Sequence, residues 1–149
     1  MAERDLLDDY IDVYLSGFKY ISELVSVPTM TYHLSFEQFL IMRDVAAGQR
    51  LSLSEVAKHR HVTRAAISRQ LKSLLDAGYI VQTPDPKDRR RQYLDLTDSG
   101  NQVTVEINQA IHKRFYGWVE VIGEKDAKEL LRIMRRVSDE VIKNDRSSD

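Results

Sequence analysis

The chain has 149 residues, of which 42% are apolar and 30% are charged, with a formal net charge of −1 and no cysteine. This composition fits one ordinary globular domain with its own core. It excludes disulfide bonds, thiolate zinc sites and sensors that act by thiol oxidation. No apolar run approaches the ~20 residues of a transmembrane helix. The acidic start MAERDLLDDY also lacks the layout of a signal peptide, so we expect a cytoplasmic protein that does not enter a membrane.

Positive charge is concentrated in the middle of the chain. Residues 50–92 carry ten Lys and Arg against four Asp and Glu. Residues 1–49 carry three against eight, and residues 93–149 carry nine against eleven. One basic region on a nearly neutral protein is typical of a nucleic-acid binder.

Two helices are predicted before the basic region. The first runs from about Asp5 to Val27 and ends before Pro28, because apolar residues recur there at helical spacing. They are Leu6, Leu7, Tyr10, Ile11, Tyr14, Phe18, Ile21 and Val25. The second begins near Ser35, which forms a capping-box pair with the glutamine three residues later, and it stops at Gly48. Its apolar positions are Phe36, Phe39, Leu40, Met42 and Val45.

A short helix, a turn and a longer helix are predicted next. The short helix, SLSEVAKH, opens at Ser52 or Leu53, and the turn covers residues 60–62. Thr63 then caps the helix RAAISRQLKSLLDAG, which ends with Gly78 in the C′ position. This order is a helix-turn-helix, whose second helix lies in the DNA major groove. Its inward positions are Ala66, Ile67, Leu71, Leu74 and Leu75, and its outward positions are Arg64, Ala65, Ser68, Arg69 and Lys72.

A β-hairpin follows directly and makes the motif winged. Tyr79–Thr83 and Gln92–Leu96 are predicted strands, because they are rich in aromatic and β-branched or alternating apolar residues. The loop between them contains two prolines and the run Arg89–Arg91, and it is too long for a tight turn. A loop of this kind stays on the surface, so its positive charge is available to a partner outside the chain.

Two further helices are predicted at the C-terminal end. The first is capped by Thr97 or Asp98, and Gly123 separates it from the second. Their apolar positions are Val103, Ile107, Ile111, Phe115, Trp118 and Ile122, then Ala127, Leu130, Leu131, Met134, Val137 and Val141. These stripes, like that of the first helix, are longer than a winged domain can cover. We therefore expect helix pairing across a twofold axis, that is, a homodimer.

The segment LSLSEVAKHRHVTRAAISRQLKSLLDAGYIVQTPDPKDRRRQYLDLTDSG resembles the MarR family of bacterial transcriptional regulators. The close of the recognition helix (LLDAGYI), the wing core (DPKDRR) and the start of the next helix (LTDSG) carry the resemblance. It implies a mainly α fold with a small β-hairpin wing, in one MarR-like domain over residues 1–149. Within it, residues 35–96 form the winged helix-turn-helix, and residues 1–30 and 98–149 form the dimerisation helices.

The resemblance also implies sequence-specific binding of a pseudo-palindromic duplex by a homodimer, with repression as the expected outcome; activation stays open. The main alternative is a winged-helix module that uses its basic face on a protein or a membrane. Steep salt dependence would favour DNA. An enzyme is the third alternative, but the sequence contains no phosphate-cradling glycine loop, nucleophile elbow or HExxH motif.

The outward face of the recognition helix supplies the first group of candidate DNA contacts. Arginine suits bidentate bonding to guanine, although an exposed basic face can also be merely solvated. Hydroxyls at helix starts suit phosphate oxygens as well as capping. The predicted contacts from the two helices are Ser54, Thr63, Arg64, Ala65, Ser68, Arg69 and Lys72.

The wing supplies the second group. The resemblance implies that Arg90 enters the minor groove and that Asp88 supports the loop or that arginine, although which arginine enters stays open. Arg89 and Arg91 are expected on phosphates. The alternative is a mobile, solvated loop. The predicted wing contacts are Lys87, Asp88, Arg89, Arg90 and Arg91.

A site for a small aromatic or anionic effector is implied by the resemblance, between the dimerisation helices and the winged domain. Its expected residues are Tyr14, Phe18, His33, Phe39, Arg43 and Trp118. The alternative is that the aromatic residues are core. No cofactor and no metal is expected, because His59 and His61 are two apart in a turn without a thiolate or a carboxylate cluster.

Overall fold

The computed structural model describes residues 5–48 and 50–143. The chain forms two compact units, which meet in the sequence between Ile111 and His112. The ends of the predicted dimerisation segments, residues 1–4 and 144–149, lie outside the described residues. Within the described ranges, no helix is long and apolar enough to cross a membrane.

The N-terminal helical segment runs further than the sequence predicts. It consists of α1 (Leu6–Val13), a π-helical turn η1 (Tyr14–Phe18) and α2 (Lys19–Met30). The predicted end before Pro28 is wrong, because Pro28 lies inside α2. A proline removes one helical hydrogen bond and crowds the preceding turn. Pro28 and Thr29 are both buried, and this tertiary packing outweighs the local preference for ending the helix.

Helix α3 (Phe36–Ala47) has the predicted boundaries. Ser35 Oγ accepts from the Gln38 N–H at 3.1 Å, and Gln38 Oε1 accepts from the Ser35 N–H at 2.9 Å, which confirms the capping box. Gly48 is the C-cap, as expected. The helix is more deeply buried than its amphipathic pattern indicates, because Ile41, which that pattern leaves out, is 1% exposed.

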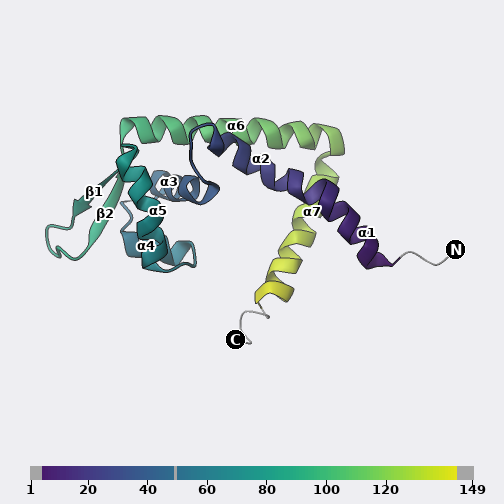
Figure 1. The fold of residues 1–149 in the computed structure, drawn as a ribbon, viewed down its shortest axis with the longest axis horizontal. Helices are drawn as coiled ribbons and strands as arrows, with labels where there is room; N and C mark the ends of the chain where they lie inside the picture. Colours follow the sequence, from purple (N-terminus) through teal and green to yellow (C-terminus); the bar gives the residue numbers. More distant parts are fainter. Residues whose placement is uncertain (1–4, 49, 144–149) are drawn as a thin grey trace. The chain divides into compact units, whose positions relative to one another are not determined.

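The predicted helix-turn-helix is confirmed as α4 (Leu53–His59) and α5 (Arg64–Asp76), joined by a turn at residues 60–62 (Figure 1). Ser52 caps α4 and Thr63 caps α5, where Thr63 Oγ1 accepts from the Ala66 N–H at 3.1 Å. The predicted inward residues of α5 are buried or half-buried, and the predicted outward residues are all exposed.

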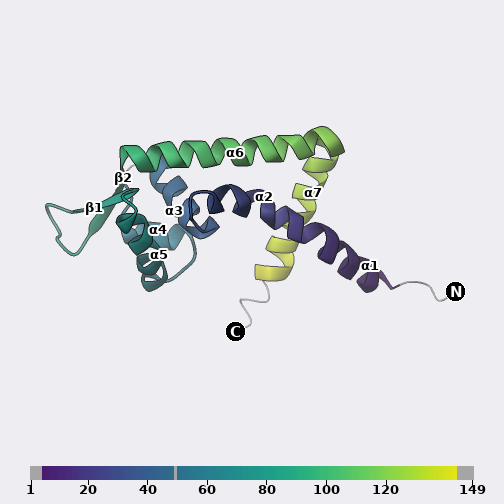
Figure 2. The ribbon, with the colours of Figure 1, turned by 45° about the horizontal axis from the view of Figure 1, so that its top comes forward.

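A Schellman motif ends α5 at the predicted glycine. Gly78 has φ +73°, its N–H donates to Leu75 O, and the Tyr79 N–H donates to Leu74 O, both at 3.0 Å. The first strand therefore starts one residue later than predicted, because the N–H of Tyr79 belongs to the helix cap. Strand β1 (Ile80–Pro84) pairs with β2 (Gln92–Leu96) in an antiparallel hairpin. Both ribbon views show this hairpin projecting from the helices (Figure 2).

The hairpin is attached to the helix-turn-helix by backbone contacts. Ile80 pairs with Leu96 at one end and Pro84 with Gln92 at the other. The Leu94 N–H donates to Leu51 O at 2.9 Å, just before α4, and Ser52 bridges Tyr93. One core joins these elements, and its most deeply buried members are Phe39, Ile41, Met42, Val56, Leu71, Leu74, Ile80, Leu94 and Ile107.

Helix α6 (Asp98–Ile122) begins in the first unit and continues into the second. The predicted break is confirmed at Gly123, which has φ +87° and precedes α7 (Glu124–Arg136). The last predicted positions lie in a π-helical segment, η2 (Val137–Ile142), rather than in a regular α-helix. No described residue of α7 or of α1 is buried. Both helices therefore carry apolar side chains that their own unit leaves uncovered, as the sequence predicts.

Candidate nucleic-acid interface

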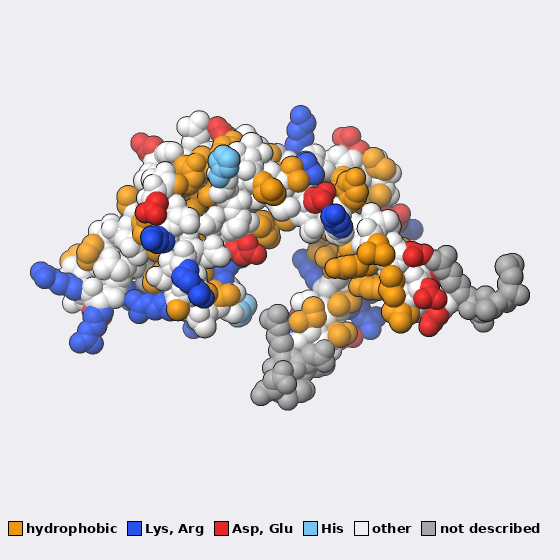
Figure 3. Space-filling view, in the orientation of Figure 1, with side chains coloured by type: hydrophobic (Ala, Val, Ile, Leu, Met, Phe, Trp, Pro, Cys, Tyr) orange, Lys and Arg blue, Asp and Glu red, His pale blue; other side chains and the backbone are white. Residues whose placement is uncertain are grey.

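The recognition helix presents a polar, positively charged face. Arg64, Ser68, Arg69 and Lys72 lie on the exposed side of α5, while Ile67 and Leu71 on the opposite side are 3% and 2% exposed. The space-filling view shows Lys and Arg side chains gathered over the end of the first unit that carries α5 and the wing (Figure 3). This face has the side chains and the exposure that contact with base edges and phosphates requires.

The turn that precedes the recognition helix is held from behind by an ion pair. Arg60 Nε donates to Asp44 Oδ2 at 2.6 Å, and its terminal nitrogen binds the other carboxylate oxygen. The Asp44 side chain is only 13% exposed, so this fork-to-fork contact is shielded from water. It fixes α4 and the turn to the end of α3. The sequence did not indicate this pair, because its members are sixteen residues apart and neither belongs to a motif.

The wing loop is ordered by its own carboxylates. Asp88 Oδ1 accepts from the Arg90 N–H at 3.0 Å, and Asp85 Oδ1 accepts from the Lys87 N–H at 2.9 Å. Asp85 also accepts from the Tyr93 hydroxyl at 3.1 Å. The N–H of Lys87 and then the Tyr93 hydroxyl keep the pKa of the Asp85 carboxyl below its ordinary value. The loop is therefore built from local turns, and the Asp88 carboxylate binds the backbone N–H of Arg90.

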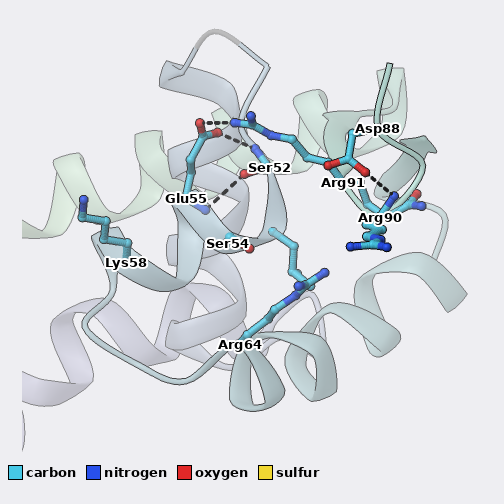
Figure 4. Close-up of a pocket in the computed structure, with 10 residues that line it drawn as sticks. Ser52, Ser54, Glu55, Lys58, Arg64, Asp88, Arg90 and Arg91 are labelled. Atoms are coloured by element: carbon cyan, nitrogen blue, oxygen red, sulfur yellow. Dashed lines mark hydrogen bonds and ion pairs between the residues drawn. The ribbon is translucent and has the colours of Figure 1, made fainter. Parts of the chain in front are cut away.

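A cleft of about 380 Å³ lies between the start of α4, the start of α5 and the wing. Figure 4 shows Arg64 and Arg90 reaching toward the same open space, with Ser54 beside it, while Lys58 extends away. Five of the twelve predicted DNA-binding residues line this cleft, namely Ser54, Arg64, Asp88, Arg90 and Arg91.

Glu55 is a functional candidate that the sequence pattern did not single out. Its Oε2 accepts from the Ser52 N–H at 2.7 Å, and its Oε1 accepts from an Arg91 terminal nitrogen at 2.7 Å. The Ser52 N–H is the main cause that keeps the pKa of the Glu55 carboxyl below its ordinary value, and Arg91 adds to it. A capping box indicates the first contact, but only the folded hairpin brings Arg91 within reach.

Tyr93 is a second residue that the sequence pattern assigned only to a strand. The Arg50 and Arg91 guanidinium carbons lie 5.1 Å and 5.4 Å from its ring centroid. Arg50 also approaches Asp95 at 3.8 Å. These contacts are within cation–π range, and they attach the base of the wing to the segment before α4.

The residues predicted for an effector site occupy different surroundings. Tyr14 and Phe18 line a cleft of about 500 Å³ along η1 and α2, with ring centroids 6.0 Å apart. Phe39 is 1% exposed and belongs to the core. His33 and Arg43 are exposed, and Trp118 belongs to the second unit. In the described part of the chain, no three His, Cys, Asp or Glu side chains group closely enough to hold a metal ion.

Comparison with known proteins bears on what this surface does. A model of the MarR family matches residues 33–91, which contain α3, the helix-turn-helix, strand β1 and the wing loop. The chain is 25% identical over 126 residues to YdgG of Bacillus subtilis, an uncharacterized HTH-type transcriptional regulator, covering 83% of this chain and 82% of that protein. It is 27% identical over 110 residues to the HTH-type transcriptional regulator FarR of Neisseria gonorrhoeae, covering 72% of this chain and 75% of FarR.

Solved structures share the fold. A structure of Staphylococcus aureus MarR in complex with salicylate and kanamycin has a TM-score of 0.74 at 20% identity, covering 93% of each chain. The apo form of Escherichia coli MarR has a TM-score of 0.67 at 18% identity, covering 91% of this chain and 98% of that one. By its matched segment, the regulators it resembles and its winged helix-turn-helix fold, this chain is similar to the MarR family of DNA-binding transcriptional regulators.

Proposed function

We propose that two copies of this chain bind a pseudo-palindromic DNA duplex and repress transcription from it. The observation that carries the proposal is the exposed face of α5, with Arg64, Ser68 and Arg69 directed away from the core beside an ordered, arginine-rich wing. In this arrangement α5 enters the major groove. Arg90 enters the minor groove of the same half-site, and Lys72, Lys87 and Arg89 neutralise phosphates.

A second copy is part of the proposal because the apolar faces of α1 and α7 have no cover within their own units. Figure 3 shows hydrophobic side chains gathered over α1. In a twofold dimer the two recognition helices reach successive major grooves roughly 34–36 Å apart. Such a regulator acts in the cytoplasm, where the DNA is.

A small aromatic anion is the proposed effector. The S. aureus MarR structure was obtained with salicylate, and the cleft at Tyr14 and Phe18 offers aromatic rings with Lys19 beside them. An effector that binds more tightly to a dimer with the wrong recognition-helix separation shifts the population away from DNA. Isothermal titration of salicylate into the wild type and into Phe18→Ala tests this: equal heats for both proteins would remove the cleft from the proposal.

Selection from a random duplex library at physiological salt tests the DNA-binding proposal. Recovery of an inverted repeat, with half-sites about one helical turn apart, is the expected result. A weak, salt-sensitive affinity for every duplex, without enrichment, would contradict specific regulation. Binding that requires a protein or an anionic vesicle instead of DNA would favour an interaction module. Reporter expression from the recovered repeat, with and without the protein, then distinguishes repression from activation.

A further inference from the structure

One acidic side chain lies among the basic residues of the proposed DNA-binding surface. Glu55 is 42% exposed and lines the cleft between α4, α5 and the wing. A carboxylate in this position repels the phosphates of an approaching duplex, so its presence has a cost for DNA binding. Its contacts indicate what offsets that cost.

Glu55 connects two elements that are far apart in the sequence. One carboxylate oxygen accepts from the Ser52 N–H at 2.7 Å and the other binds Arg91 at 2.7 Å, as the dashed lines in Figure 4 show. The first contact belongs to the capping box of α4, and it holds the carboxylate in one orientation. The second contact extends from that fixed point to the last residue of the wing loop. The hairpin is therefore attached to the helix-turn-helix by a side chain as well as by its backbone.

Arg91 is fixed at its other end too. Its N–H donates to Asp88 O at 3.0 Å, its carbonyl accepts from the Asp85 N–H at 2.9 Å, and its guanidinium lies over the Tyr93 ring. Arg89 and Arg90 differ, since neither side chain has a partner among the described residues. The three consecutive arginines are therefore not equivalent: two are free to meet DNA, and the third is already engaged.

We propose that Glu55 and Arg91 form a clamp that fixes the wing on α4 and thereby sets where Arg90 meets the duplex. Both are positioning residues, and Arg91 is not a phosphate contact. This inference rests on the proposed DNA-binding function and refines it. An exposed ion pair with no further role is the alternative, and it would contribute little to stability and nothing to the position of Arg90 on the duplex.

The direction in which one substitution changes the DNA affinity distinguishes the clamp from simple charge repulsion. Glu55→Gln removes the charge but keeps a side chain that completes a capping box, so α4 is expected to stay folded. Without a clamp, loss of a negative charge beside DNA strengthens binding. With a clamp, E55Q weakens operator binding about two- to fivefold, the range of an exposed pair. Unchanged or tighter binding by E55Q would overturn the proposal. Glu37→Gln, at an exposed position in the first turn of α3, is the matched control and is expected to bind as the wild type does.

Arg91 is tested by salt dependence. An arginine on a phosphate contributes about one unit to the slope of log K against log salt, whereas a clamped arginine contributes none. Arg91→Gln is therefore expected to weaken binding without changing this slope, and E55Q/R91Q is expected to bind no more weakly than the weaker single variant. A slope reduced by about one, or losses that add in the double variant, would return Arg91 to the phosphate contacts.

A measurement without DNA keeps the clamp separate from the function on which it rests. Amide hydrogen exchange over residues 85–92 is expected to be faster in E55Q than in the wild type, with unchanged exchange in the core of α5. If the wild type selects no operator while this difference is present, the regulator proposal fails and the clamp stands. Equal exchange in both proteins would remove the clamp, even if the operator is found.

Discussion

Gly100 has the least room of any glycine in the described residues. A Cβ built there would lie 1.9 Å from the carbonyl oxygen of Tyr79, which is backbone and cannot rotate away. Gly100→Ala is therefore expected to push α6 away from the start of β1 and to lower the free energy of unfolding by about 1–3 kcal/mol. Urea denaturation measures this. Gly117→Ala is the control, because a Cβ at Gly117 meets nothing within 4 Å and alanine favours a helix by roughly 0.5–1 kcal/mol. Equal effects of both changes would show that the close approach does not matter.

Replacing an arginine of the recognition helix is expected to affect DNA binding differently from replacing an arginine of the wing. Arg64 and Arg69 lie on the recognition helix, where a lost base contact costs about 1–3 kcal/mol of discrimination. Arg90 lies in the wing, and a side chain inserted into the minor groove responds to the width of the groove more than to the base sequence. Alanine at Arg64 or Arg69 should therefore change the preferred sequence in a repeated library selection. Alanine at Arg90 should weaken binding to all duplexes. Equal losses on operator and random DNA for all three variants would contradict this division.

The contact between Tyr32 and Glu106 makes part of the stability depend on pH. The Tyr32 hydroxyl donates to the Glu106 carboxylate. This bond is the main cause that lowers the pKa of Glu106 and the main cause that raises the pKa of Tyr32. A lowered carboxyl pKa gives stability that is present above the unfolded value and lost as the pH falls through the folded one. A raised hydroxyl pKa gives stability that is lost as the pH rises through the folded value.

Tyr32→Phe is accordingly expected to destabilise the protein most between about pH 5 and pH 9. Below and above that window the wild type should approach the variant, because the carboxylate or the hydroxyl has then lost its partner. Chemical denaturation at several pH values measures the difference. Tyr20→Phe, at an exposed tyrosine of α2, is the control. A difference that does not vary with pH would contradict this assignment.

At the scale of elements, the helix caps account for much of what the sequence predicts. The capping box at Ser35 is formed by residues close together in the sequence, so the destabilisation caused by its loss can be stated in advance. Ser35→Ala is expected to destabilise the protein by about 0.5–2 kcal/mol, and Ser35→Gly by only a few tenths. Thermal unfolding followed by circular dichroism measures both. Ser35 lies outside the proposed DNA-binding surface, so DNA affinity per folded molecule should not change in either variant.

Elements whose limits are local were predictable from the sequence, and those set by distant contacts were not. Ser35, Thr63 and Gly78 mark helix ends because capping and the left-handed conformation depend on adjacent residues. Pro28 was misread because its helix is held by burial, which no local pattern reports. The outward face of α5 followed from periodicity. The Glu55–Arg91 pair did not, because it joins residues 36 positions apart.

At the scale of the whole molecule, the uncovered helices predict an oligomer. The side chains of Leu131 and Val137 are 48% and 47% exposed, and among the described residues none on α7 is buried. Leu131→Asp is expected to shift the protein from dimer toward monomer in sedimentation, and to weaken binding to an inverted repeat more than to a single half-site. Asp126→Asn, five residues earlier in the same helix, should leave the dimer intact. A wild type that sediments as a monomer at all concentrations would contradict the dimer.

The junction at the end of the recognition helix has a consequence for the DNA itself. Tyr79 donates to Leu74 O, Thr97 N–H donates to Tyr79 O at 3.0 Å, and Thr97 Oγ1 donates to Gly78 O at 2.6 Å. The last turn of α5, the residue that precedes β1 and the start of α6 are thus joined by adjacent hydrogen bonds, without a linker between them. In a protein that contacts both grooves, the recognition helix and the wing then cannot move apart along the duplex. For the DNA-binding mode proposed above, this junction predicts a fixed number of base pairs between the major-groove and minor-groove positions of a half-site, and one base pair inserted within a half-site is expected to abolish simultaneous recognition of both grooves.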